Sequence, residues 1–494
     1  MAITNANFNN IDYCKVAGKL IITCSSDKIA SAGVFNYRFL LEIHYGTKVY
    51  SYTFRPNMAT SGAYGFINIT KILQSLTSIK TVQTFPTIPD GSSIVDNEFY
   101  QSIFNAPHTK DNAGTQYPAI YSINDTFKEI ELKLFDFYGA TADAVPTKQT
   151  AGSQTALMYI IGGYDKESDK INVDYSDYKL TGSTKLFITS NHEDEGNYKV
   201  IRNLKKDDYG TISFLNSTKT VNASSDPKYL IIKYYKDVSG TVSLLATQHI
   251  LNSTLFGGET PSTTLTQEYV LTVGCYPANL NKLPATYDRP IDFINSPLAY
   301  YHVYFATDTA GASPVSQAYR FYHSSDDMRD TGCKYDRQRF AYSNSFGVFE
   351  FITFTELRTD NISSKNTTIK GSVFDYGAQF PTASWSGQGV SANIFRELAY
   401  TPDVAHQGEK TVATDFNETF TVNTGFLSKS DTKKVEELFL SPRVVYINSD
   451  GSARSVILET SSINSIRNIN KHYEQVSYSL TFRYSVPTYN NIIF

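Results

Sequence analysis

Three clusters of acidic residues are the parts of this sequence best suited to chemistry. They lie at residues 192–196, 206–208 and 325–330. Paired carboxylates bind Ca²⁺ through their oxygens and, at a suitable separation, hydrolyse glycosidic bonds. Calcium needs alternating oxygen donors around a turn glycine, and the first cluster, His-Glu-Asp-Glu-Gly, provides these only roughly. The pattern favours a solvated hairpin turn there, and we assign neither catalysis nor metal binding to any of the three clusters.

The third acidic cluster lies among arginines. Arg329 and Asp330 are adjacent, and Arg337 and Arg339 follow within ten residues. Guanidinium and carboxylate groups form strong charge-assisted hydrogen bonds. These four residues are therefore candidates for ion pairs between subunits, and pairing within one subunit or with water is an equal alternative.

A loop rich in Gly and Ser carries the only tryptophan of the chain, Trp385, a few residues after Tyr376. Aromatic rings beside polar groups are typical of ligand sites, so these two residues are candidates for a glycan-binding loop. The chain contains 36 tyrosines. Most aromatic positions are therefore expected on sheet faces or in protein–protein contacts, where tyrosine is enriched.

The motifs of common cofactor and catalytic sites are missing from the sequence. It contains no G-x-G-x-x-G, no G-x-x-x-x-G-K-[ST], no G-x-S-x-G and no H-E-x-x-H. Its eight histidines are scattered, so we expect core or surface histidines rather than a zinc site. No cofactor is predicted, and the chain is not expected to be an enzyme.

Composition limits the classes of partner. The 494 residues are 41% hydrophobic and 19% charged, which is typical of a folded chain rather than a disordered one. A net charge of −4, from 44 basic and 48 acidic residues, gives no basic field for nucleic acid. No window approaches 18 uninterrupted apolar residues, and the first thirty residues lack the pattern of a secretory signal. We therefore expect neither nucleic acid nor membrane as a partner.

The cysteines carry no metal or redox spacing. Cys14, Cys24, Cys275 and Cys333 are all far from a C-x-x-C arrangement. We expect reduced thiols that act as small core residues, and a bridge between Cys14 and Cys24 across a hairpin is the alternative.

Alternation of apolar and polar residues dominates the sequence and predicts antiparallel strands. The cleanest run is 476–484, and residues 443–447 and 455–459 flank an Asp-Gly that suits a hairpin. A short helix is predicted at about 430–440, with Ser430 as its cap and Pro442 after its end. The expected fold class is all-β, with several antiparallel sandwich domains of Ig-like or jelly-roll-like type and a few short helices.

Shifts in composition predict three domains. A loop or linker is expected between about 140 and 182, and a proline-rich break at 277–290. The expected domains are an N-terminal sandwich at 1–165, a middle Ig-like domain at 166–282 and a C-terminal domain at 283–494. Phe346, Phe349, Phe351 and Phe354 are expected to fill the core of the C-terminal sheet.

Four stretches combine turn residues with alternating apolar ones. They are 55–73, 207–215, 344–354 and 440–447. Together, and in this order, they resemble a group of β-rich structural proteins from tailed bacteriophages and prophages of Bacteroidetes. The stretches touch all three predicted domains, so the resemblance covers most of the chain.

The resemblance implies a component of the phage neck or tail, in particular a ring of the short-tail assembly of crAss-like phages. It further implies synthesis in the host cytoplasm, localisation in the virion, a cyclic homo-oligomer and contacts with neighbouring tail or neck proteins. A ring subunit needs rigid domains and heterologous interfaces that close a cycle. The absence of heptads and of a long helical stem disfavours a portal, a tape measure or a coiled-coil fibre.

Two functions therefore compete at the level of sequence. The leading expectation is a virion structural protein that forms a ring and carries out no catalysis. The alternative is a receptor- or glycan-binding tail accessory that uses the loop around Trp385. A polysaccharide depolymerase is disfavoured, because no β-helix repeat is visible.

Overall fold

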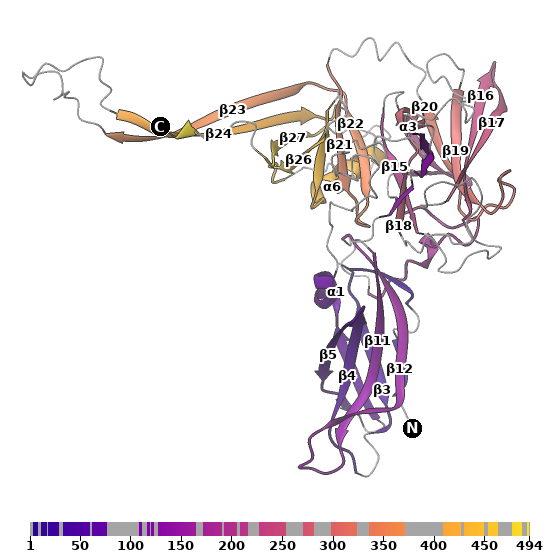
Figure 1. Ribbon diagram of the computed structural model, residues 1–494, viewed down its shortest axis with the longest axis vertical. Helices are drawn as coiled ribbons and strands as arrows, with labels where there is room; N and C mark the ends of the chain where they lie inside the picture. Colours follow the sequence, from indigo (N-terminus) through magenta and orange to yellow (C-terminus); the bar gives the residue numbers. More distant parts are fainter. Residues whose placement is uncertain are drawn as a thin grey trace, which may run out of the picture.

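A computed structural model gives the architecture of the chain (Figure 1). It describes residues 3–7, 11–16, 18–28, 33–59, 62–76, 108–110, 116–118, 120–122, 127–164, 171–189, 192–204, 208–215, 227–252, 270–280, 298–323, 335–370, 409–425, 429–448, 453–462, 477–486 and 492–493. The described chain is mostly β, with antiparallel sheets and the short helices α1 (Thr70–Leu76), α3 (Pro277–Leu280) and α6 (Lys429–Leu440). The expected all-β fold class is confirmed.

The molecule has a lower sandwich that holds the N-terminus and an upper body from which a long hairpin projects (Figure 1). One sheet of the sandwich has the strand order β1 (Ile3–Ala6), β3 (Ile21–Ser26), β7 (Gly62–Asn68), β6 (Asn57–Ala59). The other has the order β2 (Tyr13–Lys15), β12 (Thr147–Ile161), β11 (Phe127–Gly139), β4 (Phe35–Tyr45), β5 (Lys48–Phe54). Both sheets contribute to one apolar core.

The two sheets of the sandwich are in close contact at Gly65. A Cβ atom at this position of β7 would lie 2.5 Å from the ring of Phe39 on β4, in the facing sheet. Only glycine leaves space for that ring, so the position fixes the contact between the layers.

The prediction of a loop or linker at 140–182 is wrong for residues 147–161, because these form the strand β12. Its first half is the polar run Thr-Lys-Gln-Thr-Ala-Gly-Ser-Gln-Thr, which shows no apolar alternation. Hydrogen bonding to β11 and β2 makes it a strand. The propensity for strand depends on context, so a polar run without apolar alternation is recognised as a strand only once its partner is known.

The upper body begins with two sheets that pack on one core. The larger has the order β13 (Glu193–Glu195), β14 (Tyr198–Leu204), β20 (Tyr319–His323), β19 (Leu298–Ala306), β16 (Tyr229–Val238), β17 (Thr241–Leu251). The smaller has the order β10 (Ile120–Ser122), β18 (Val270–Gly274), β15 (Thr211–Leu215).

These two sheets cross both predicted domain boundaries. β10 comes from before residue 165, and β19 and β20 come from after residue 282, yet all three pair with strands of the predicted middle domain. The proline-rich stretch therefore marks a connection between strands of one body. Proline ends strands equally well inside and between domains, so composition does not distinguish the two cases.

The third sheet of the upper body contains the C-terminal part of the chain. Its order is β22 (Phe349–Phe354), β21 (Gln338–Ser343), β25 (Val444–Ile447), β26 (Ala453–Leu458), β27 (Ser479–Tyr484), β24 (Glu409–Asn423), β23 (Arg358–Lys370), and β28 (Ile492–Ile493) also pairs with β24. The predicted hairpin of 443–447 with 455–459 and the predicted helix near 430–440 are both confirmed. A separate ribbon joins β8 (His108–Lys110) to β9 (Gln116–Pro118).

Both faces of this third sheet are covered near β21 and β22. Phe354 belongs to the core that includes Val435 and Leu438 of α6, whereas Phe351 belongs to the core shared with the six-stranded sheet. Phe346 lies in a third cluster, at the joint with the lower sandwich. The four phenylalanines expected in one core are therefore distributed among three, because alternate residues of a strand face opposite sides.

The turn between β21 and β22 joins the upper body to the sandwich. The backbone N–H of Tyr164 donates to Ser345 O over 3.1 Å. Gly163 has φ of +107°, and a Cβ there would lie 2.3 Å from the same oxygen. Lys15 of β2 extends its Nζ to 3.8 Å from the centre of the Phe346 ring. Backbone contact and a buried cation therefore fix the turn at the end of the sandwich.

The hairpin of β23 and β24, which we call the arm, extends away from the upper body on the left of Figure 1. Its base is buried: Phe420 and Val422 are fully buried, and Arg358 lies 4.2 Å from the Phe420 ring, while several residues of β24 further along the arm are half-buried. Every residue of β23 after Arg358 is exposed. β24 also pairs with β27 at its base and with β28 at Ala413 and Thr414, so the exposed edge of the arm is β23.

Candidate functional site

The outer face of the six-stranded sheet carries a group of half-buried aromatic side chains. In β19, Tyr301, Val303 and Phe305 point into the core, which leaves Tyr300 and His302 on the other side. We call this the tyrosine face, and it consists of Tyr198, Tyr235, Tyr300, His302, Arg320 and Tyr322. Its side chains come from β14, β16, β19 and β20.

Arg320 lies at the centre of the tyrosine face. Its guanidinium carbon lies 4.1 Å from the ring centre of Tyr198 and 4.6 Å from that of Tyr300. Its Nε donates to His302 Nε2 over 3.0 Å, and its Nη1 donates to the Tyr322 hydroxyl over 3.1 Å. Stacked cations on aromatic rings stabilise such faces and hold the rings in fixed positions.

Burial, with Arg320 and Lys233 nearby, lowers the pKa of His302 to about 4. The imidazole is therefore neutral at pH 7 and accepts the hydrogen bond from Arg320. A second cation beside Arg320 would repel it, so the neutral ring is required for this arrangement.

The first acidic cluster forms the edge of the tyrosine face. β13 pairs with β14 through a turn at Gly196, which has φ of +59°. Glu195 accepts from Arg202 and from the Tyr322 hydroxyl, and lies 3.5 Å from Arg320 Nη1. This is the hairpin turn favoured by the sequence, and among the described residues no group of three or more His, Cys, Asp or Glu is placed to bind a metal ion.

Of the predicted interface residues, Arg339 has a clear position. Its Nε lies 3.4 Å from Asp208 Oδ1, and both side chains are almost fully buried. The hydroxyl of Thr353 donates to the same carboxylate oxygen over 3.3 Å. Arg339 therefore makes an ion pair within its own chain, the alternative that the sequence left open.

Of the other predicted residues, the structure describes only Arg337. Arg337 is half-buried just before β21. Arg329, Asp330, Tyr376 and Trp385 lie outside the described residues. Their roles at an interface or in a glycan-binding loop stay predictions.

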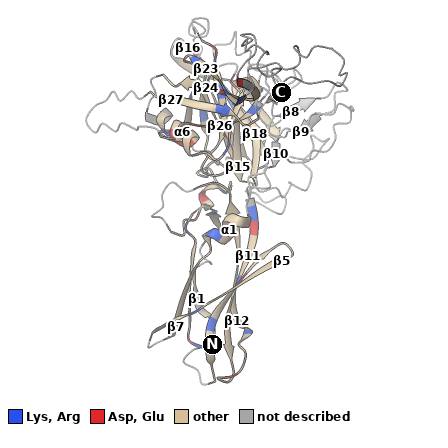
Figure 2. Cartoon of the chain, turned by 90° about the vertical axis from the view of Figure 1, so that its left-hand side faces the viewer, with Lys and Arg blue, Asp and Glu red and all other residues tan. Residues whose placement is uncertain are grey.

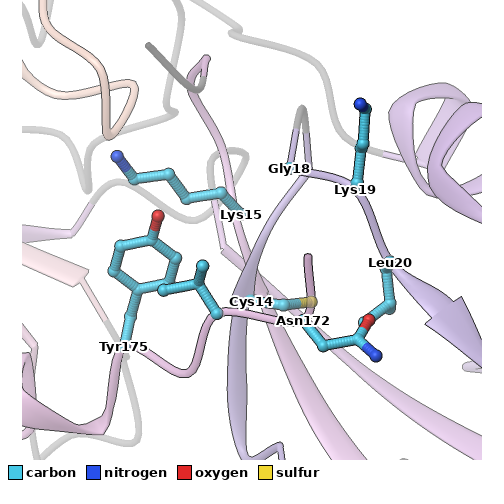
Figure 3. A pocket seen from close by; sticks show the side chains of 8 residues that line it. Cys14, Lys15, Gly18, Lys19, Leu20, Asn172 and Tyr175 are labelled. Atoms are coloured by element: carbon cyan, nitrogen blue, oxygen red, sulfur yellow. The ribbon is translucent and has the colours of Figure 1, made fainter. Parts of the chain in front are cut away.

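A shallow pocket lies beside the joint between the sandwich and the upper body (Figure 3). Cys14, Lys15, Leu20, Asn172 and Tyr175 are among its lining residues, and Lys15 extends along Tyr175. Burial raises the pKa of the Cys14 thiol to about 12, so it stays protonated and is a poor nucleophile. Asn172 binds the backbone of Ile21 through both side-chain atoms, at 2.9 and 3.0 Å. These contacts make the pocket part of the joint.

In the view of Figure 2, basic and acidic residues appear as short, separate segments of the described chain. No helix in the described part is both long and apolar enough to cross a membrane. Aromatic and apolar surface is therefore the more informative feature for function.

Comparison with protein-family models and with curated proteins finds no match to this chain. Functional inference consequently depends on the geometry described above and on the resemblance noted in the sequence.

Sequence reasoning did not find the tyrosine face. Tyrosines on sheet faces were expected from composition. Residues 198, 235, 300 and 320 meet because β14 pairs in parallel with β20 and β16 pairs with β19. The only local signal is the alternation of Tyr300, His302 and Tyr304 with buried residues in β19.

Proposed function

We propose that this chain is a structural subunit of an oligomeric ring in the neck or tail of a bacteriophage and acts through protein–protein contacts. The observation that carries this proposal is the arm. Its outer strand β23 is exposed along its length beyond Arg358 and, among the described strands, pairs only with β24, and a long free edge is a template for pairing with another chain. The resemblance of four sequence stretches to phage structural proteins supports the same function.

The rigidity of the rest of the molecule fits this proposal. The upper body holds its three sheets together through cores that include fully buried Tyr234, Tyr301 and Phe340. A ring transmits load through its subunits, and close-packed aromatic cores provide stiff bodies for that purpose. The tyrosine face adds a surface of the composition found at the centre of protein interfaces, with Tyr and Arg together.

The experiment for the ring is the oligomeric state of the purified full-length chain. Mass photometry at increasing concentration, followed by negative-stain class averages of the same sample, should show a single oligomer with cyclic symmetry. A chain that stays monomeric at every concentration, and does not co-purify with phage particles, would contradict the proposal.

A glycan-binding role is the second candidate, because half-exposed tyrosines with a fixed arginine also stack on sugars. A glycan array with the Trp385→Ala and Tyr300→Ala variants tests it. Binding that disappears in either variant supports this role and locates the site, whereas a flat array for the unmodified protein contradicts it.

A further inference from the structure

One edge strand of the six-stranded sheet, β17, has no charged residues and has a side that pairs with no other described strand. Among the described strands, β17 pairs only with β16, so its other side is a free edge. Its eleven residues include no Lys, Arg, Asp, Glu or Pro. Val242 is 46% exposed and Leu244 is 52% exposed. Apart from one bulge near Leu245, β17 lacks the features that protect edge strands from pairing.

The arm provides a second free edge of similar length. β23 has 13 residues and, in the described part of the chain, pairs only with β24. It carries Lys365 and Lys370, and lysine on an edge disfavours pairing between two like edges. β17 is uncharged, so β23 meets no like charge when it pairs there.

The two edges lie on opposite sides of the upper body. The hairpin of β16 and β17 stands at the upper right of Figure 1, and the arm extends to the left. An arm that projects away from β17 of its own chain can reach β17 of a neighbour. Contacts between two different surfaces of identical chains run head to tail and close into rings when the rotation permits.

We propose that the arm of one copy binds the next copy by strand addition, with β23 alongside β17, and so extends the six-stranded sheet. Backbone hydrogen bonds along the two edges provide the affinity, and exposed Ile362 of β23 meets the apolar side chains of β17. This inference rests on the proposed ring function and names the contact through which the ring forms.

Two complementary variants test the contact. The edge variant, Val242→Lys with Leu244→Lys, places charges on exposed positions of β17 and leaves the arm intact. The arm variant replaces residues 362–416 by a short Gly-Ser turn and leaves β17 intact. Val238→Lys is the matched control, because Val238 is 52% exposed in the same hairpin but lies on β16. Circular dichroism of each protein verifies that it is folded.

Mass photometry of the variants, alone and mixed, gives the outcomes. We expect the oligomer to be lost in each variant alone, kept in Val238→Lys, and replaced by dimers in an equal mixture, because one intact arm then meets one intact edge. An edge variant that still forms the oligomer would overturn the inference and leave the ring function standing. An oligomer that survives loss of the arm would overturn it too. A monomeric unmodified chain would instead contradict the ring function itself.

Discussion

Two hairpins of equal length have opposite environments in this molecule. β11 and β12 have 13 and 15 residues, and so do β23 and β24 of the arm. The first hairpin has neighbours on both edges and buries Leu132, Leu134 and Ile160 completely. The second buries side chains only at its base, near Phe420.

The difference lies in which residues alternate. β11 reads Phe-Lys-Glu-Ile-Glu-Leu-Lys-Leu, with an apolar face that fits a sandwich, whereas β23 reads Arg-Thr-Asp-Asn-Ile-Ser-Ser-Lys. The arm keeps β-forming Thr and Ile but has little apolar area to bury within its own chain. The length of a hairpin therefore sets how far its strands extend. Its side-chain pattern decides whether the surface that it packs on is in the same chain or in another.

The largest expected contrast is between an apolar residue in the core of the first hairpin and an apolar residue on the exposed arm. Leu132→Ala removes a fully buried side chain of β11 and should lower the free energy of unfolding by about 2–5 kcal/mol. Ile362→Ala on the arm, where the side chain is 57% exposed, should change the stability of the monomer by less than about 0.5 kcal/mol. Urea denaturation of both variants measures the difference, and equal losses would show that the arm is covered within the chain.

A second contrast concerns pH, because the tyrosine face contains a buried histidine and the arm contains none. The pKa of His302 is lowered to about 4 from its usual 6.5. Above pH 6.5 the ring is neutral in both states. Between pH 6.5 and 4 the unfolded chain binds a proton that the folded chain does not, so stability falls as the pH falls.

The expected size of this effect is roughly 2–3 kcal/mol between pH 7 and pH 4.5. His302→Gln keeps an acceptor for Arg320 but cannot titrate, so its stability should fall less over the same range. Denaturation curves of both proteins at the two pH values measure the difference. An identical fall would show that His302 does not contribute.

A third contrast concerns the joint at the end of β12. Gly163→Ala introduces a Cβ 2.3 Å from Ser345 O at a residue with φ of +107°. Gly33→Ala is the control, since Gly33 has φ of +82° and no atom within 4 Å of its Cβ position. Both variants bear backbone strain, and Gly163→Ala should lose about 1–3 kcal/mol more through the clash. Thermal unfolding compares the two variants, and equal shifts would mean that the joint opens freely.

The smallest expected effect is on the surface of the arm. Thr414 donates its hydroxyl to Asn366 Oδ1 across the two strands over 3.0 Å, and this pair is exposed. Thr414→Ala should change the stability of the monomer by no more than about 0.5 kcal/mol. A loss above 1 kcal/mol in the same urea assay would show that the arm contributes to the folded core.

Local sequence patterns predicted much of the fold. The features that they did not predict share one cause. The alternation in 476–484 and the pattern of 430–442 gave a strand and a helix that the structure confirms, although the helix begins at Lys429 and Ser430 lies within it rather than at its cap. The parallel pairing of β2 with β12 and of β14 with β20 joins residues far apart in sequence, and it decides both the domain division and the tyrosine face. Such pairings depend on the whole chain, so no window of sequence contains them.

The interface residues show the same limit. Arg339 stands in a run of charges that resembles a solvated cluster, yet it pairs with Asp208, more than a hundred residues earlier. The arm was not predicted either, because the polar sequence of β23 lacks the apolar alternation from which strands were predicted.

Hydrogen–deuterium exchange, measured on the monomer and on the assembled protein, tests the central claim most directly. The account predicts that amides of β11 and β12 are protected in both states, and that amides of β23 gain protection only on assembly. Strong protection of β23 in the monomer, or rapid exchange of β23 in the assembled ring, would contradict the claim that β23 pairs with a strand of another copy.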